Sequence, residues 1–197
     1  MSTDTTPLSP SDKPDPAKDG IDHINCYSKA QTALGQQLSN FSHVPFDHPE
    51  FGFFASLEAY WYWLKTGMQH NSLRRLYGAT AKSAGIRQLE VRMDVEEFHR
   101  LFSDGIRLRI AQNPKLRAAV RQSTLPFRHY YVYGTNPPVV RDQTRMYWQM
   151  EVMEEVRATL KRDEPIKLSD GTPAARAAIR EVEANPLPEA LRFPTED

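Results

Sequence analysis

The chain has 197 residues, of which 40% are hydrophobic and 25% are charged, the composition of a soluble globular domain with its own core. Lysine plus arginine and aspartate plus glutamate both number 25, so no overall field draws the protein to nucleic acid or to an anionic membrane. The single cysteine, Cys26, excludes an intramolecular disulfide, and no apolar run approaches the roughly 20 residues of a membrane span. We expect a cytoplasmic protein without a membrane partner, and its oligomeric state is left open.

Proline content divides the chain into three parts. Residues 1–20 hold four prolines and four aspartates without the apolar stretch of a signal peptide, so we expect a disordered N-terminal arm. Residues 21–162 are expected to form one compact domain. Residues 163–197 hold five prolines and form a Pro-rich extension with one short helix, from Thr172 to about Ala184.

Three short segments open the domain: a strand over 24–28, a polar turn region over 31–37, and a loop or hairpin over 43–52. A helix is expected over 56–66, because Ser56 can cap its start and Gly67 can end it. A second helix is expected over 71–84, with Gly85 as its stop.

The second half of the domain is dominated by longer helices. The clearest is expected over 94–113, where apolar residues recur at spacings of three and four: Val95, Phe98, Leu101, Phe102, Ile106 and Ile110. Pro114 either lies beyond the end of this helix or opens a further helix over 115–122. An aromatic strand is expected over 130–133, and a last helix is expected over 142–161. The predicted fold class is therefore mainly α, a single compact helical domain with a few short β-strands.

The helix predicted over 56–66 carries the residues best suited to chemistry. Glu58 and Lys65 are seven residues apart, so they share a face of the helix at about 10 Å along its axis, too far for a direct ion pair. Two such groups can flank a bound sugar. The carboxylate can stabilise the positive charge that develops when a glycosidic bond breaks, or it can activate water. A desolvated lysine can instead attack the anomeric carbon and form a Schiff base.

Neighbouring side chains fit the same substrate. Trp61 or Tyr62 would pack against a flat base, while Ser39 and Asn40, in the loop before the helix, suit sugar hydroxyls. The competing interpretation is that the aromatic helix is only core. Glu58 and Lys65 would then merely interact favourably with the helix dipole at its opposite ends. The residue types alone leave both interpretations open.

Several segments in the same order resemble the NADAR family, and they span residues 21 to 160. They are Ile24-Asn25-Cys26-Tyr27-Ser28, Leu38-Ser39-Asn40-Phe41, Ser56-Leu57-Glu58 followed by Lys65, Ala81-Lys82 with Gly85, Ile110 to Leu116, and Met150 to Arg157. That family includes an N-glycosidase acting on riboflavin-biosynthesis intermediates and enzymes that remove ADP-ribose from guanine. The resemblance implies a NADAR-like fold.

The resemblance also implies roles for individual residues. Glu58 would be the essential catalytic carboxylate and Lys65 a covalent participant, while Asn40 would hold the phosphate or ribose. The other substrate-binding candidates are Ser39, Phe41, Trp61, Tyr62 and Lys82. The implied activity is hydrolysis of the N-glycosidic bond of an ADP-ribose- or nucleotide-derived substrate, such as ADP-ribosylated guanine, free or within nucleic acid. No metal or cofactor is expected.

The sequence departs from the family pattern at the helix motif and beyond it. Ala59 stands where histidine is usual, Tyr62-Trp63 stand where Gln-Ala is usual, and residues 89–95 offer no tryptophan where the family has a functional one. Two alternatives therefore stay open: a non-catalytic module that binds ADP-ribose or NAD, and an interaction protein whose aromatic helix is only core.

Other candidate features are less specific. The six histidines show no metal-binding spacing. A run of basic residues is either a solvated helical surface or a phosphate-facing patch: Arg107, Arg109, Lys115, Arg117, Arg121 and Arg128. The aromatic segment 128–134 predicts either a buried strand or rings on which a base could stack.

Overall fold

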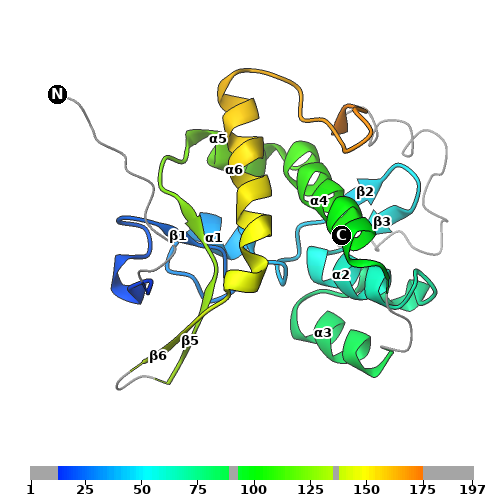
Figure 1. Cartoon of the computed structure of the whole chain (residues 1–197), viewed down its shortest axis with the longest axis horizontal. Helices are drawn as coiled ribbons and strands as arrows, with labels where there is room; N and C mark the ends of the chain where they lie inside the picture. Colours follow the sequence, from blue (N-terminus) through cyan, green and yellow to red (C-terminus); the bar gives the residue numbers. More distant parts are fainter. Residues whose placement is uncertain (1–12, 89–92, 135–137, 175–197) are drawn as a thin grey trace, which may run out of the picture.

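The computed structural model describes residues 13–88, 93–134 and 138–174. Helices predominate and the strands are short, which confirms the predicted mainly α class with a few short β elements. The two longest helices, α4 (Val95–Gln112) and α6 (Tyr147–Lys161), pack against each other at the centre of the fold (Figure 1). Shorter helices α2 (Leu57–Lys65) and α5 (Pro114–Gln122) contact α4, and α3 (Gly78–Arg87) covers α2.

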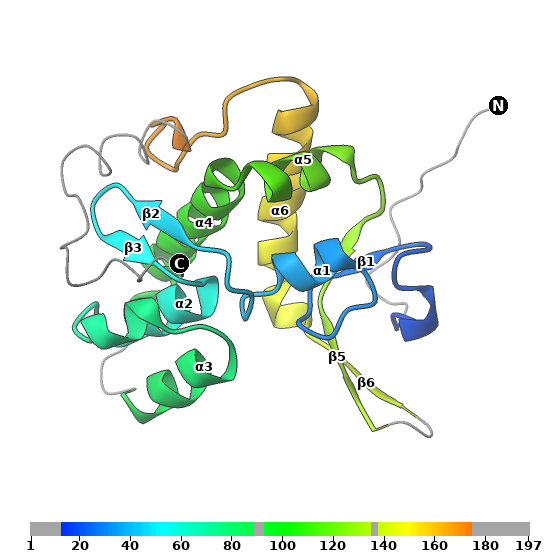
Figure 2. The same ribbon diagram turned by 180° about the vertical axis from the view of Figure 1, so that it is seen from behind.

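The described strands form three small pairs. Parallel pairing joins β1 (Ile24–Asn25) to β4 (Phe127–Arg128), while β2 (Phe46–His48) and β3 (Gly52–Phe54) form a hairpin. A second hairpin, β5 (Tyr130–Tyr133) with β6 (Val139–Asp142), projects from the body of the molecule in both views (Figures 1 and 2). The remaining described elements are α1 (Ala33–Leu38) and the 3₁₀ turns η1 (Pro16–Lys18), η2 (Asn71–Arg75) and η3 (Thr144–Met146).

The core lies where α2 packs against α4. The predicted apolar stripe of α4 is buried from Phe98 to Ile110, although Val95 at its start is 65% exposed. Gly105 of α4 makes the close approach possible, because a Cβ there would lie 2.6 Å from Cε1 of Tyr60. The fully buried Tyr60 in turn donates its hydroxyl hydrogen to the carbonyl of Leu101 at 3.3 Å.

Several predicted elements differ from the structure. The strand expected over 24–28 is limited to Ile24–Asn25, and Gly85, expected to end a helix, lies inside α3. The single helix expected over 71–84 is two elements, η2 and α3, because Leu76 and Tyr77 between them are extended. The last helix begins at residue 147 instead of 142, because Asp142 pairs within β6. The polar segment 31–37 contains helix α1, which is capped by the Thr32 hydroxyl accepting the Gly35 N–H.

The described parts of both extensions pack on the domain. Buried Asp19 accepts hydrogen bonds from the backbone of Asn25 and Gln31, so residues before the expected boundary at residue 21 also pack on the domain. Ile166, Leu168 and Ala174 belong to the core cluster, which therefore extends past residue 162. The helix expected from Thr172 to Ala184 lies mostly outside the described residues. Within the part of the chain that the structure describes, no helix is long and apolar enough to cross a membrane.

Candidate functional site

Helix α2 forms as the sequence predicts, and it fixes the two candidate catalytic residues. The Ser56 hydroxyl accepts the Ala59 N–H at 3.1 Å and donates to the Leu76 carbonyl at 3.0 Å, which starts the helix and ties it to the chain before α3. Gly67, with φ of 67°, ends it. Glu58 consequently lies in the first turn of α2 and Lys65 is its last residue.

Glu58 is a buried carboxyl group with a perturbed pKa. Glu58 is only 8% exposed, and burial raises the pKa of its carboxyl to about 7. The positive charges of Lys82 and Lys65 oppose this shift without cancelling it. Near neutral pH both the acid and the carboxylate form of this group are accessible, so it suits a role in proton transfer.

The loop that carries the predicted sugar-binding residues lies against Glu58. The backbone N–H of Glu58 donates to the carbonyl of Asn40 at 2.9 Å. The Asn40 amide also donates to the side-chain oxygen of buried Gln149, on α6, at 3.2 Å. Ser39 is buried and its hydroxyl accepts the Phe41 N–H at 3.3 Å, so this hydroxyl shapes the loop.

Arg109, on α4, holds the same loop through hydrogen bonds to its backbone. This fully buried residue of α4 donates to the carbonyls of Leu38 and Ser39, each at 2.9 Å. Burial lowers its pKa to about 10. Among the buried side-chain nitrogens and oxygens of the described residues, its Nε is the one without a hydrogen-bond partner. Arg109 therefore positions the loop, a role that its place in the basic run did not reveal.

Lys82 and Tyr62 approach Glu58 from the α3 side. Gly85 lets α3 lie directly on α2, because a Cβ at this position would lie 2.1 Å from Cγ of Tyr62. Burial, followed by the charge of Glu58, raises the pKa of Tyr62 to about 12. Exposed Lys82 lies with its ammonium 5.9 Å from the ring of Phe41, which joins this lysine to the loop.

Lys65 and Trp61 lie on the α4 side of the same helix. The Lys65 ammonium is 4.5 Å from the Trp61 ring centre and 5.6 Å from that of Phe98. Trp61 itself packs edge-on against Phe98 and Phe102, with ring centres 4.6 and 5.0 Å apart. Much of the aromatic helix is therefore core, as the packing interpretation expects, but Glu58 and Lys65 lie at the margin of that core.

A residue far along the sequence completes the surroundings of Glu58. The pKa of Tyr131, on β5, is raised by burial and next by the charge of Glu58. Its ring centre lies 5.2 Å from that of Tyr27. The sequence offered Tyr131, within the segment 128–134, as a candidate for stacking, but it gave no signal that this residue lies near Glu58.

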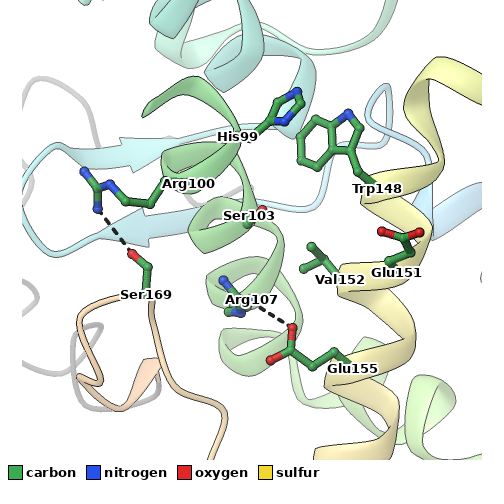
Figure 3. Close-up of a pocket in the computed structure, with 9 residues that line it drawn as sticks. All are labelled: His99, Arg100, Ser103, Arg107, Trp148, Glu151, Val152, Glu155 and Ser169. Carbon is green, nitrogen blue, oxygen red and sulfur yellow. Dashed lines mark hydrogen bonds and ion pairs between the residues drawn. The ribbon is translucent and has the colours of Figure 1, made fainter. Parts of the chain in front are cut away.

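A cavity of about 430 Å³ lies elsewhere, between α4 and α6 (Figure 3). The rings of His99 and Trp148 stack across it at 4.2 Å, and Arg107 is paired with Glu155 at 2.9 Å. None of the eight predicted site residues lines this cavity.

The other sequence candidates separate in the structure. Arg109 and Arg128 are buried, and Arg121 pairs with Asp163 at 2.6 Å, so the basic run does not form one phosphate-facing patch. Within residues 13–88, 93–134 and 138–174, no group of three His, Cys, Asp or Glu side chains is placed to hold a metal ion.

The candidate site therefore consists of a buried carboxyl with a raised pKa, within electrostatic reach of two lysines and two tyrosines, beside a loop held by buried Arg109 and Gln149. No protein family, curated protein or solved structure matches the chain.

Proposed function

We propose that the protein is a NADAR-like N-glycosidase, which hydrolyses the N-glycosidic bond of an ADP-ribose- or nucleotide-derived substrate such as ADP-ribosylated guanine. The observation that carries this proposal is the buried Glu58 carboxyl, whose pKa of about 7 is matched to proton transfer at neutral pH. The single buried cysteine fits the reducing conditions of the cytoplasm.

Glu58 supports each step of this reaction. When the bond between the anomeric carbon and the base breaks, its electron pair stays on the base nitrogen, which takes up the Glu58 proton. The resulting carboxylate stabilises the positive charge on the ribose and accepts a proton from the attacking water. The water oxygen forms the new bond to the anomeric carbon, and the protonated carboxyl is restored.

Lys65 offers a covalent route to the same products. Its amine attacks the anomeric carbon as the base leaves, and opening of the ribose ring gives an imine that water then hydrolyses. The rings of Trp61 and Phe98 lie against the Lys65 ammonium, and such cation–π contacts stabilise the charged form of the amine. The amine must therefore lose its proton to solvent before it attacks, while Glu58, two helical turns away on α2, protonates the leaving base.

We expect borohydride to trap a protein–sugar adduct in the wild-type protein and not in Lys65→Ala, because only an imine intermediate is reduced to a stable amine. Mass spectrometry of the intact protein after reaction with an ADP-ribosylated guanine oligonucleotide measures the adduct. Lys161→Ala is the matched control, since Lys161 is an exposed lysine that also ends a helix, α6, and lies outside the candidate site. Loss of the adduct in the control alone, or no adduct in the wild type, contradicts the role of Lys65.

One observation favours binding without turnover as the second candidate. Ala59 is fully buried, so the helix position where the family usually has histidine supplies no polar group to the site. A module of this kind would bind ADP-ribose in calorimetry and release none from the modified oligonucleotide. Detection of free ADP-ribose separates the two functions.

A further inference from the structure

The hairpin of β5 and β6 presents an aromatic face to solvent. Residues along a strand alternate between its two faces, so Tyr131 and Tyr133 share one face. The register pairs Tyr131 with Arg141 and Tyr133 with Val139, which adds these two residues to it. Tyr133 is 47% exposed, Val139 is 53% exposed, and Arg141 is also exposed.

The opposite face anchors the hairpin to the body of the molecule. Tyr130 is fully buried, and its hydroxyl lies 2.7 Å from Nε2 of His23. Asp142, paired with Tyr130 in the register, accepts the hydroxyl hydrogen of Tyr147 at 2.6 Å. The exposed face is therefore carried by an anchored strand of a hairpin that projects from the body of the molecule (Figures 1 and 2). On this face the Tyr133 side chain is exposed and Tyr131 is half-buried.

The rings on the exposed face form a continuous series. The ring centre of Tyr131 lies 5.2 Å from that of Tyr27 and 6.2 Å from that of Tyr133. The guanidinium of Arg141 lies 5.3 Å from the centre of the Tyr133 ring. Of the four described residues on this face, none is acidic and one is a cation.

This series leads away from the candidate site. The charge of Glu58 helps to raise the pKa of Tyr131, so the two side chains lie within electrostatic reach, and the rings of Tyr27 and Tyr133 lie against Tyr131. Tyr131, Tyr133 and Arg141 together form a surface on which a chain molecule could lie.

We propose that the β5–β6 face binds a single-stranded nucleic acid, with bases on the rings of Tyr131 and Tyr133 and a backbone phosphate near Arg141. Aromatic rings beside cations are the common means of holding unpaired bases, because every base has a flat face to stack. A duplex keeps those faces covered, and a purely apolar protein partner would not need the arginine. That the bound strand delivers its nucleotide to Glu58 rests on the proposed function.

The test is the fluorescence anisotropy of a labelled, unmodified DNA strand of about 12 nucleotides, titrated with the full chain. We expect Tyr133→Ala to weaken binding about 10-fold, the loss typical of one stacked base. We expect Arg141→Ala to weaken binding and to reduce the slope of log affinity against log salt by about 0.7, the value for one phosphate contact on a single strand.

Two matched variants control for exposure and charge. Tyr77→Ala removes a tyrosine that is 52% exposed at the start of α3, and Arg162→Ala removes an exposed arginine at the end of α6. Both should bind the strand as the wild type does. Binding that is unchanged in Tyr133→Ala, equal losses in the controls, or equal competition by duplex DNA overturns the proposal.

The same assay separates this proposal from the proposed function. Glu58→Gln should keep its affinity for the unmodified strand even when it releases no ADP-ribose. Tyr133→Ala should still cleave a small ADP-ribosylated guanosine, while it loses rate on the modified strand at low concentration. If no variant cleaves any substrate but the binding losses occur as expected, the nucleic-acid face stands and the glycosidase falls. If cleavage occurs and the wild type binds no single strand, the reverse holds.

Discussion

Glu58→Gln is expected to stabilise the protein at about pH 8 by on the order of 3 kcal/mol. This is the free-energy equivalent of the shift in the pKa of the Glu58 carboxyl from 4.5 to about 7 on folding. Because the folded-state pKa is raised, the folded protein binds more protons than the unfolded chain between these two values. The wild type therefore loses stability as the pH rises through this window. Glutamine resembles the protonated acid and has no charge to bury, so the variant escapes this loss.

Chemical denaturation at about pH 4 and about pH 8 measures the effect, and the two proteins should differ little at the lower pH. Glu97→Gln is the matched control, since Glu97 also lies in the first turn of a helix, α4. Its hydrogen bond with Arg100 lowers its pKa, so its replacement should not stabilise the protein. A Glu58→Gln variant that is less stable than the wild type at about pH 8 would show that the carboxyl is well solvated or well paired.

Gly85→Ala is expected to destabilise the fold by about 3 kcal/mol, near the upper range for overpacked sites. The new methyl would lie 2.1 Å from Cγ and 2.4 Å from Cβ of Tyr62. Rotation of the ring cannot relieve a contact with Cβ, which is fixed to the backbone of α2, so α3 must move away. That movement carries Lys82 away from Glu58, and we expect activity to fall together with stability.

Thermal unfolding of Gly85→Ala measures the first effect, and the rate of ADP-ribose release from a guanine-modified oligonucleotide measures the second. Ser83→Ala introduces alanine at an exposed position of α3 and should leave both the stability and the rate of ADP-ribose release unchanged. A Gly85→Ala variant as stable as the wild type would contradict the close packing of α2 on α3.

Local signals were sufficient where an element depends on its own residues. The Ser56 cap and the left-handed Gly67 bound α2 as predicted, and Asp94 caps α4 through the N–H groups of Glu96 and Glu97. These bounds put Glu58 in the first turn of α2 and Lys65 at its last residue. The break between η2 and α3 escaped prediction because it depends on a distant contact, the Ser56 hydroxyl bound to the Leu76 carbonyl.

The surroundings of Glu58 were less predictable for the same physical reason. Arg109, Tyr131 and Gln149 reach the site from parts of the chain that only the tertiary fold brings together. A basic residue in an amphipathic helix is usually solvated, so nothing in the sequence marked Arg109 as buried. Lys82 entered through the family resemblance, and the effect of its charge on the pKa of Glu58 follows from the approach of α3 that Gly85 allows.

The release of ADP-ribose from an ADP-ribosylated guanine oligonucleotide at neutral pH tests the central claim most directly, with wild type, Glu58→Gln and Glu97→Gln compared side by side. We predict release by the wild type and by Glu97→Gln. We predict a rate on the order of 10³-fold lower in Glu58→Gln, because amide nitrogen cannot replace a carboxyl in proton transfer. Equal rates in wild type and Glu58→Gln, or binding of the oligonucleotide by the wild type without release, would contradict the role of Glu58 as the catalytic carboxyl.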